Sequence, residues 1–309
     1  MEPITFQPLY MTRVWGGRTL ETNYHRKLPD NQPYGESWEL SDREHEQSLV
    51  AGGEFAGMTL NQLWKERRDE IFGLGLEGDR FPLLIKILDA RDDLSIQVHP
   101  PVEIAASLGG DPKTEMWYIA DCDPDAKLYI GFKNGVSRGD FKKSLGDGSV
   151  EEKVHAVQPK IGQSIFIPSG RLHAIGAGFL IYEIQQNSDT TYRVFDWNRV
   201  GLDGTPRDLH VEESMKSIDF DDFEPGMDEP NGGTLASCEY FKVDERVLSE
   251  RDTFGSTPEA FAIVTVVSGT VTSQGGSEFK AGDFFLLPKG AASLIAQSES
   301  KVLLTTIPV

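Results

Sequence analysis

The stretch GQSIFIPSGRLH at residues 162–173 has a counterpart in GDFFLLPKGAAS at residues 282–293. Both contain a glycine, five further residues, a proline, four further residues and a final polar side chain. This spacing predicts a turn at the glycine, a strand that ends at the proline, and a loop that returns the first residue of the next strand to a barrel interior. His173 ends the first copy and Ser293 ends the second. The chain therefore contains an internal β repeat in which only the first copy has a histidine.

Short apolar runs separated by Gly, Pro, Asn and Asp recur on both sides of this repeat. FPLLIKIL at 81–88 and FAIVTVVSG at 261–269 are two of them. Many short strands at such spacing predict an all-β fold, in a sandwich or barrel. Helical patterning is limited to residues 58–73, 102–109 and 208–220. We therefore expect a few helices that decorate a core of sheets.

The segment 219–233, DFDDFEPGMDEPNGG, is acidic, rich in Gly and Pro and without a sustained period, which favours a linker between domains. The spacing of the repeat resembles the second motif of the cupin family of small jelly-roll barrels, whose last position is a metal-binding histidine. This resemblance implies two tandem cupin barrels. Residues 1–218 would form a metal-binding domain with helical decorations, and residues 234–309 a cupin-like barrel without metal ligands.

The composition limits the possible partners and compartment. The 309 residues carry 49 acidic and 30 basic side chains, a formal charge of −19, which disfavours binding to nucleic acid or to an anionic membrane. An anionic substrate must therefore find a local basic pocket. The two cysteines, Cys122 and Cys238, lie far apart, which excludes a disulfide framework or a thiolate zinc site. The sequence has the pattern of neither a signal peptide nor a membrane span. We expect a cytoplasmic protein, whose oligomeric state the sequence leaves open.

Four residues have the spacing and chemistry of a metal site. Gln97 and His99 lie two apart on an expected strand, so their side chains project from one face. Glu115 begins a later strand and could approach the same point, and His173 completes the set. Two imidazoles, one carboxylate and one amide oxygen suit zinc, although iron or manganese would also accept them. Each residue alone could be structural, but together they predict one metal ion per chain. We interpret the remaining histidines as surface or structural residues: His25, His45, His155 and His210.

Longer stretches carry a more specific resemblance. They are VWGG at 14–17, GESWELSD at 35–42, FPLLIKILDARDDLSIQVHPP at 81–101, KTEMWYI at 113–119 and RLHAIGAGFLIYEIQQNSDTTYRVFDW at 171–197. In these stretches the chain resembles the type I mannose-6-phosphate isomerases in their short bacterial form. The resemblance implies a zinc ion bound by Gln97, His99, Glu115 and His173, and reversible conversion of mannose 6-phosphate to fructose 6-phosphate. It also implies that three further side chains face the substrate: Lys113, Glu183 and Arg193.

Isomerisation of an aldose to a ketose requires proton removal next to the carbonyl, a cis-enediol and return of the proton to the neighbouring carbon. Burial of Lys113 beside zinc should lower its pKa enough for acid or base chemistry, with substrate binding alone as the alternative role. Glu183 is the rival base. The planar donor fork of Arg193 suits a phosphate or an oxyanion. Trp15 could form a wall of the pocket against a sugar, or lie in the core.

Other functions are compatible with parts of this pattern. A metal cupin such as a dioxygenase usually needs more histidines, and the Gln97 and Arg193 side chains argue against it. A non-catalytic sugar-phosphate sensor would keep the fold and the pocket. An isomerase of an unphosphorylated aldose would not need a phosphate site. Comparison of turnover on mannose and mannose 6-phosphate distinguishes the last alternative from the leading interpretation.

Overall fold

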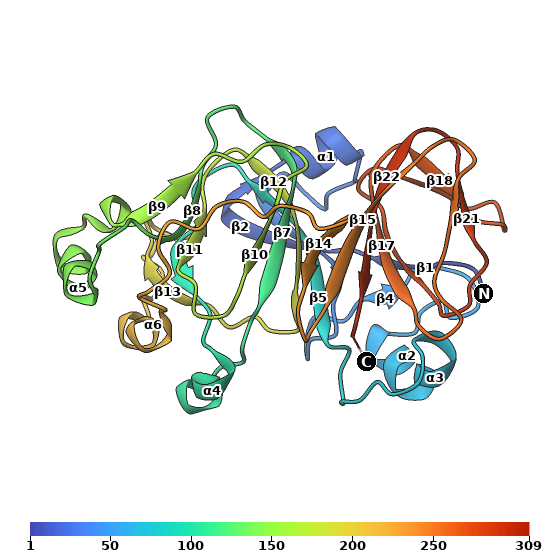
Figure 1. The fold of residues 1–309 in the computed structure, drawn as a ribbon, viewed down its shortest axis with the longest axis horizontal. Helices are drawn as coiled ribbons and strands as arrows, with labels where there is room; N and C mark the ends of the chain where they lie inside the picture. The colour runs from blue at the N-terminus through green and yellow to red at the C-terminus, as the bar shows by residue number, and fades with distance from the viewer. Residues whose placement is uncertain (309) are drawn as a thin grey trace. The chain divides into compact units, whose positions relative to one another are not determined.

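The computed structural model describes residues 1–308. The chain forms two compact units, each assembled from separate stretches of sequence (Figure 1). The central unit consists of Tyr10–Ser37 and Lys86–Asp228. The terminal unit consists of Met1–Leu9, Trp38–Ile85 and the chain from Glu229 onward. The domain boundaries at 218/219 and 233/234 stay a prediction. The chain passes from the central to the terminal unit after Asp228, which lies within the predicted linker. The terminal unit also includes residues from the N-terminal half of the chain.

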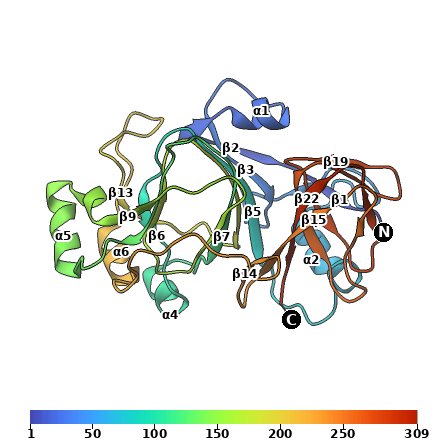
Figure 2. The ribbon, with the colours of Figure 1, turned by 45° about the horizontal axis from the view of Figure 1, so that its top comes forward.

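Two antiparallel sheets face one another in the central unit (Figure 2). The six-stranded sheet has the order β10-β7-β12-β5-β2-β3 and the five-stranded sheet the order β13-β6-β11-β8-β9. The strands of the first are β2 (Leu9–Gly17), β3 (Tyr34–Leu40), β5 (Leu83–Ala90), β7 (Glu115–Cys122), β10 (Ser164–Ile167) and β12 (Phe179–Gln186). Those of the second are β6 (Ile96–Val98), β8 (Leu128–Phe132), β9 (Val154–Val157), β11 (His173–Ile175) and β13 (Tyr192–Phe195).

Alternate side chains of these strands form a buried core. On β7, Trp117 and Ile119 point to the same face, because side chains two apart on a strand share a face. They pack with Leu128 and Ile130 of β8, which alternate in the same way. A second buried cluster joins other β6, β8 and β9 side chains to helices α5 (Arg138–Asp147) and α6 (Val211–Ser217). The helices therefore cover apolar side chains of the five-stranded sheet.

The terminal unit also contains two sheets. Their strand orders are β14-β15-β22-β17-β20-β1-β4 and β16-β21-β18-β19. The first sheet consists of β1 (Ile4–Gln7), β4 (Leu49–Val50), β14 (Thr234–Ser237), β15 (Lys242–Leu248), β17 (Ala262–Ser268), β20 (Phe284–Leu287) and β22 (Ser300–Thr306). The second consists of β16 (Thr253–Phe254), β18 (Thr270–Thr272), β19 (Glu278–Lys280) and β21 (Leu294–Ala296).

The sequence repeat corresponds to a repeated local structure. Gly162 and Gly282 adopt φ values of 88° and 85°, and each precedes a strand, β10 or β20, that pairs antiparallel with an earlier neighbour. After the proline, His173 begins β11 and is fully buried. Ser293, however, is exposed and β21 begins one residue later, at Leu294. The prediction that Ser293 points to the interior is therefore wrong, because strand alternation starts from a different residue in the second copy.

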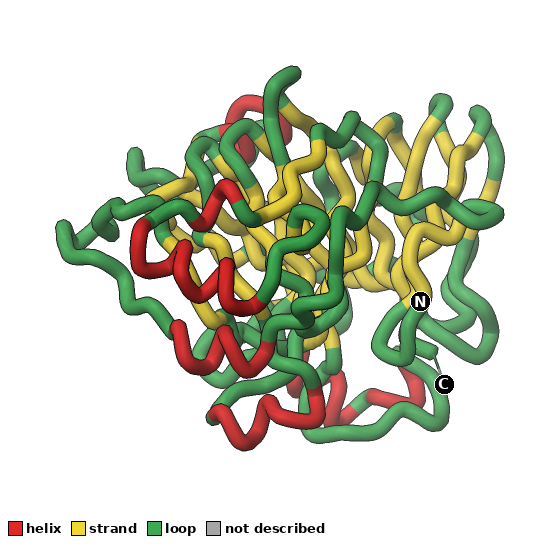
Figure 3. The backbone as a smooth tube through the Cα atoms, turned by 60° about the vertical axis from the view of Figure 1, so that its left-hand side comes forward, coloured by secondary structure: helices red, strands yellow, loops and turns green. Residues whose placement is uncertain are grey.

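Helices are few and lie to the outside of the strands (Figure 3). The predicted helical segments correspond to α2 (Leu60–Glu66) with α3 (Arg68–Ile71), α4 (Val102–Ala105) with a 3₁₀ turn at Ala106–Leu108, and α6. Helices α1 (Thr19–Tyr24) and α5 were not predicted. Within residues 1–308, every helix is too short or too polar to span a bilayer. The structure confirms a mostly β fold, but its described strands form open sheets and no closed barrel.

The segment after α6 is held to the loop that precedes His173. The guanidinium of Arg171 donates from Nε and Nη2 to the two carboxylate oxygens of Asp222, at 2.9 and 3.0 Å. Its Nη1 donates to the carbonyl of Phe166 at 2.8 Å. Both charged side chains are mostly buried, so the pair is less screened by water than a surface ion pair. The pair thus fastens residues near 222 to the start of β11.

We predict that Asp222→Ala lowers the free energy of unfolding by about 1–3 kcal/mol, because it leaves a mostly buried guanidinium without its carboxylate. Urea unfolding of the full chain measures this difference. The neighbouring Asp221 is exposed, so Asp221→Ala is the matched control and should have little effect. Equal stabilities of the two variants would contradict the prediction.

Candidate metal centre and active site

Three of the four predicted ligands meet in one buried cluster of the central unit. His99 follows β6, Glu115 begins β7 and His173 begins β11. Their potential ligand atoms all lie within 4.8 Å of one another, and each residue is at most 1% exposed. Among residues 1–308, this is the one group of His, Cys, Asp or Glu side chains close enough to hold a metal ion.

The two imidazoles are oriented by the backbone. Nδ1 of His99 lies 2.8 Å from the carbonyl oxygen of Thr190, and Nδ1 of His173 lies 2.9 Å from that of Arg171. Each Nδ1 must donate to its carbonyl, which leaves the lone pair on Nε2. The Nε2 atoms lie 3.5 and 3.7 Å from the oxygens of Glu115. This backbone support of the distal nitrogen is typical of histidines that bind metals.

Both histidines are held in the neutral form that a metal requires. Burial lowers the pKa of His99, and the charge of Lys113 lowers it further. Burial also lowers the pKa of His173, to about 3, with a further contribution from His99. Neutral imidazoles have a free lone pair, so they need no proton loss before they bind a cation.

The carboxylate of Glu115 fits a divalent cation. Both of its oxygens are buried, and Oε1 has no hydrogen-bond partner among the described residues. Oε2 lies 2.6 Å from Nζ of Lys113. Burial would raise the pKa of Glu115, but the charge of Lys113 holds it well below its ordinary value. A buried, ionised carboxylate with an unpartnered oxygen beside two imidazole lone pairs is a donor set that suits zinc.

Gln97 lies at the edge of this cluster. It faces His173 across the β6–β11 pair, and its amide Nε2 is 3.3 Å from Nε2 of His173. Its Oε1 accepts a hydrogen bond from the hydroxyl of Ser95 at 3.3 Å. As a ligand, Gln97 would have to present its oxygen in place of its nitrogen. Its role as a fourth ligand therefore stays a prediction.

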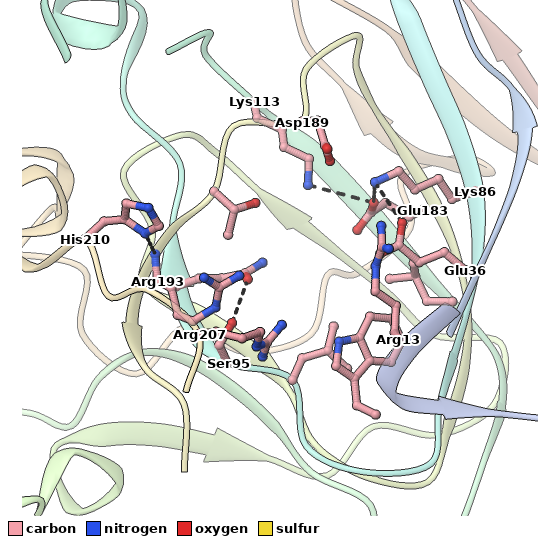
Figure 4. A pocket seen from close by; sticks show the side chains of 15 residues that line it. Arg13, Glu36, Lys86, Ser95, Lys113, Glu183, Asp189, Arg193, Arg207 and His210 are labelled. Carbon is pink, nitrogen blue, oxygen red and sulfur yellow. Dashed lines mark hydrogen bonds and ion pairs between the residues drawn. The ribbon is translucent and has the colours of Figure 1, made fainter. Parts of the chain in front are cut away.

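A pocket of about 400 Å³ lies next to the cluster, lined by Gln97 and Lys113 (Figure 4). Trp15, predicted as a pocket wall or a core residue, is both: it lines the pocket and is only 4% exposed. Lys113, Glu183 and Arg193, predicted to face the substrate, all line it as well. The sequence analysis missed several further lining residues: Arg13, Glu36, Lys86, Ser95, Asp189, Thr191, Arg207 and His210.

One wall of the pocket is a chain of alternating charges on the six-stranded sheet. Nε of Arg13 lies 2.7 Å from Glu36, whose other oxygen is 3.6 Å from Nζ of Lys86. Lys86 lies 3.4 Å from Oε1 of Glu183, and Lys113 lies 3.8 Å from the same oxygen. These residues come from β2, β3, β5 and β12, together with the residue two positions before β7. Each buried charge thus has a neighbour of opposite sign.

The side chains around Lys113 and Glu183 shift the pKa of both groups upward. Burial would lower the pKa of Lys113, but the carboxylates of Glu115 and Glu183 raise it above its ordinary value. The expected lowering relied on burial beside zinc, and the two carboxylates of the protein act in the opposite direction. Burial raises the pKa of Glu183, and the charge of Glu115 raises it further.

The opposite wall is basic. Arg193 donates from Nη1 to the carbonyl of Asp208 at 2.9 Å, and its buried Nε has no hydrogen-bond partner among the described residues. Arg207 forms a bidentate pair with Asp196, at 2.8 and 2.5 Å. His210, interpreted from the sequence as surface or structural, lines this wall and accepts a hydrogen bond from the backbone N–H of Arg193 through Nδ1. Two guanidiniums at one wall are the local basic pocket that the acidic chain needs for an anionic ligand.

The sequence held a signal for some of the missed residues. Lys86 interrupts the apolar run FPLLIKIL, and a charge within a buried strand requires a partner. Glu36 similarly lies on β3 (Tyr34–Leu40), a strand whose seven residues are all buried. Arg207 and His210, in contrast, lie on an irregular connection, where no period indicates which side chains turn inward.

Comparisons with known proteins identify the family of the chain. Residues 4–130 match the family model described as phosphomannose isomerase type I, catalytic domain. Mannose-6-phosphate isomerase ManA of Bacillus subtilis (strain 168) is 38% identical over 308 residues, which cover 94% of each chain.

Solved structures extend the agreement to the fold. The crystal structure of the mannose 6-phosphate isomerase from Bacillus subtilis matches 99% of this chain and 100% of that chain at 33% identity, with a TM-score of 0.89. A mannose 6-phosphate isomerase bound with zinc and yttrium covers 99% of this chain and 100% of its own, and shares the fold at 15% identity with a TM-score of 0.76. Identity of 38% across nearly the whole of both chains means that this chain belongs to the type I phosphomannose isomerase family.

Proposed function

We propose that this protein interconverts mannose 6-phosphate and fructose 6-phosphate through a cis-enediol, with one zinc ion per chain held by His99, Glu115 and His173. The observation that carries the proposal is the single pocket that joins Lys113 and Glu183, beside the cluster, to a basic wall of two arginines. The relative ManA bears the name of this activity. Gln97 is the proposed fourth ligand, through its amide oxygen.

Zinc is the metal that we favour. The donor set has two neutral imidazoles and one carboxylate, which zinc accepts readily. A protein of the same fold is described as bound with zinc. When bound, the cation supplies positive charge that stabilises the negative charge developing on substrate oxygens.

We assign proton transfer to Glu183 and charge stabilisation to Lys113. Glu183 faces the pocket through Oε1 and would accept the proton from C2 of the open-chain aldose, then return it to C1. The hydroxyl on C2 loses its proton to become the ketose carbonyl, and the oxygen on C1 gains one. Lys113 is committed to Glu115 at 2.6 Å and stays protonated, so it would donate a hydrogen bond to the developing oxyanion.

We assign phosphate binding to Arg193 and Arg207, at the opposite wall. Asp196 holds Arg207 in a fixed orientation, and the unpartnered Nε of Arg193 is available for a hydrogen bond. Ser95 and Thr191 add hydroxyl groups to the lining of the pocket. The hydrogen-bonded carboxylate at this wall is Asp196, which pairs with Arg207. The positive charge of the second guanidinium favours binding of a phosphate dianion, so the wall supports a phosphorylated substrate over a free aldose.

We also propose that the two units are related as tandem cupin domains. The support is the repeated turn, strand and proline at Gly162–His173 and residues 282–293. Hydrogen bonds at the turns correspond too: Gln163 N–H donates to the carbonyl of Lys160, and Asp283 N–H to that of Lys280. Among residues 1–308, only the copy of the repeat in the central unit ends in a buried histidine, which supports one active centre per chain.

Removal of the metal should abolish turnover of mannose 6-phosphate, and added zinc should restore it. His173→Ala should bind less than a tenth of the zinc of the unaltered protein, because one of three strong donors is lost. Metal content by atomic emission and a coupled isomerase assay measure both effects. His155→Ala is the control, since His155 lies outside the cluster. Full turnover after chelation would refute the metal dependence.

Replacement Lys113→Met should lower kcat by about 100-fold or more while zinc content stays unchanged. The variant removes the ammonium group that would stabilise the oxyanion, so kcat falls. Zinc content is kept, because the Lys113 ammonium no longer competes with the cation for Glu115. The exposed Lys133→Met is the control and should behave as the unaltered enzyme. Loss of zinc from the Lys113 variant would instead show that this lysine is structural.

Replacement Arg207→Ala should raise KM for mannose 6-phosphate by about 10-fold or more, and it should have little effect on any turnover of mannose, which has no phosphate for Arg207 to bind. Arg199→Ala is a matched control, because Arg199 contacts the same Asp196 at 3.0 Å but does not line the pocket. Steady-state kinetics on mannose 6-phosphate and on mannose distinguish a phosphorylated substrate from a free aldose. Equal turnover of the two sugars by the unaltered enzyme would assign a free aldose as substrate, and tight binding without turnover would indicate a sensor.

A further inference from the structure

Trp117 contacts both halves of the active centre. It lies on β7 directly across from Glu183 of β12, with which it is paired in the sheet register. Its indole Nε1 donates to Oε2 of Glu183 at 3.0 Å. Its ring also packs edge to face against His173, with centroids 5.4 Å apart. One buried side chain therefore lies between the carboxylate assigned to proton transfer and a candidate metal ligand.

The two oxygens of Glu183 have different surroundings. Oε2 receives the indole hydrogen bond, whereas Oε1 faces the ammonium groups of Lys86 and Lys113. A carboxylate held at one oxygen by a rigid, fully buried donor cannot rotate about its last torsion without breaking that bond. The lone pairs of Oε1 are thus kept in one direction relative to the pocket, where proton transfer requires alignment.

A purely structural role would explain why Trp117 is buried, but not why its indole N–H donates to the carboxylate of Glu183. A buried indole N–H needs an acceptor, and backbone carbonyls meet this need at other tryptophans of the chain. Trp64 donates to the carbonyl of Gly78 at 3.0 Å, and Trp197 donates to that of Leu94 at 2.7 Å. Trp117 instead donates to an ionisable side chain that lines the pocket.

We infer that Trp117 is a positioning residue for the isomerase reaction, which orients Glu183 for proton transfer through the indole N–H bond to Oε2. The inference rests on the proposed function, because it requires Glu183 to carry the proton. It predicts that the N–H group matters for kcat, while the ring itself supports the packing around His173.

Trp117→Phe tests this, because phenylalanine keeps an aromatic ring in the core but lacks the donor. The expected result is a loss in kcat of about tenfold or more, a KM within about threefold of the original, and full zinc content. With mannose 6-phosphate deuterated at C2, the isotope effect on kcat should be at least as large as for the unaltered enzyme. The control is Trp64→Phe, which removes an equally buried indole donor in the terminal unit and should leave kcat unchanged.

A second variant covers the case in which Trp117→Phe does not fold. Incorporation of the benzothiophene analogue of tryptophan at position 117 keeps the bicyclic shape and removes only the N–H donor, and the same kinetic result is expected. An unchanged kcat in either folded variant overturns the inference. So does loss of zinc, or a reduced isotope effect, since these outcomes mean that the ring acts through His173 or on another step.

Glu183→Gln separates this inference from the proposed function. If Glu183→Gln turns over mannose 6-phosphate at the original rate, Glu183 does not transfer the proton and both the assignment and the inference fail. If Glu183→Gln is inactive while Trp117→Phe matches Trp64→Phe, the proposed function stands and only the role of Trp117 is wrong.

Discussion

The buried contact between Lys113 and Glu115, 2.6 Å long, is the constraint on which the rest of the site depends. A carboxylate taken out of water costs several kcal/mol unless opposite charge and hydrogen bonds compensate it. Lys113 supplies part of this compensation, and His99 and His173 present lone pairs toward the same carboxylate. Glu115 therefore stays ionised beside two imidazole lone pairs, as a carboxylate ligand of a divalent cation must be.

The need of a buried charge for a neighbour of opposite sign also applies to other side chains of the six-stranded sheet. Lys113 also lies near Glu183, which faces Lys86, and Lys86 faces Glu36 with Arg13 beyond it. Alternating signs allow a row of ionised groups to exist within an otherwise apolar interior, because no charge is left without a counter-charge. The row gives the protein a polar pocket wall on a rigid sheet. A rigid wall suits an isomerase, in which small displacements of a base reduce the rate.

The basic wall has a different origin. Arg193 lies on β13, but Arg207 and His210 lie on the connection that leads to α6. Asp196 fixes both Arg207 and Arg199, so a carboxylate near the end of β13 orders the loop that follows it. The protein is strongly acidic as a whole, and this arrangement concentrates positive charge at one place. Selectivity for an anionic substrate is thus a local property of the pocket.

The sequence by itself determined the mostly β class, the local repeat and the metal cluster, because strand period and ligand chemistry are local properties. His99, Glu115 and His173 could be identified from their spacing, and Lys113 from its distance of two residues from Glu115. Only the tertiary structure decided that Lys86 and Glu36 join them, that His210 turns inward and Ser293 outward, and that Trp117 donates to Glu183. These facts depend on strand order and on loop paths, which bring together residues far apart in sequence, and no local period encodes such pairings.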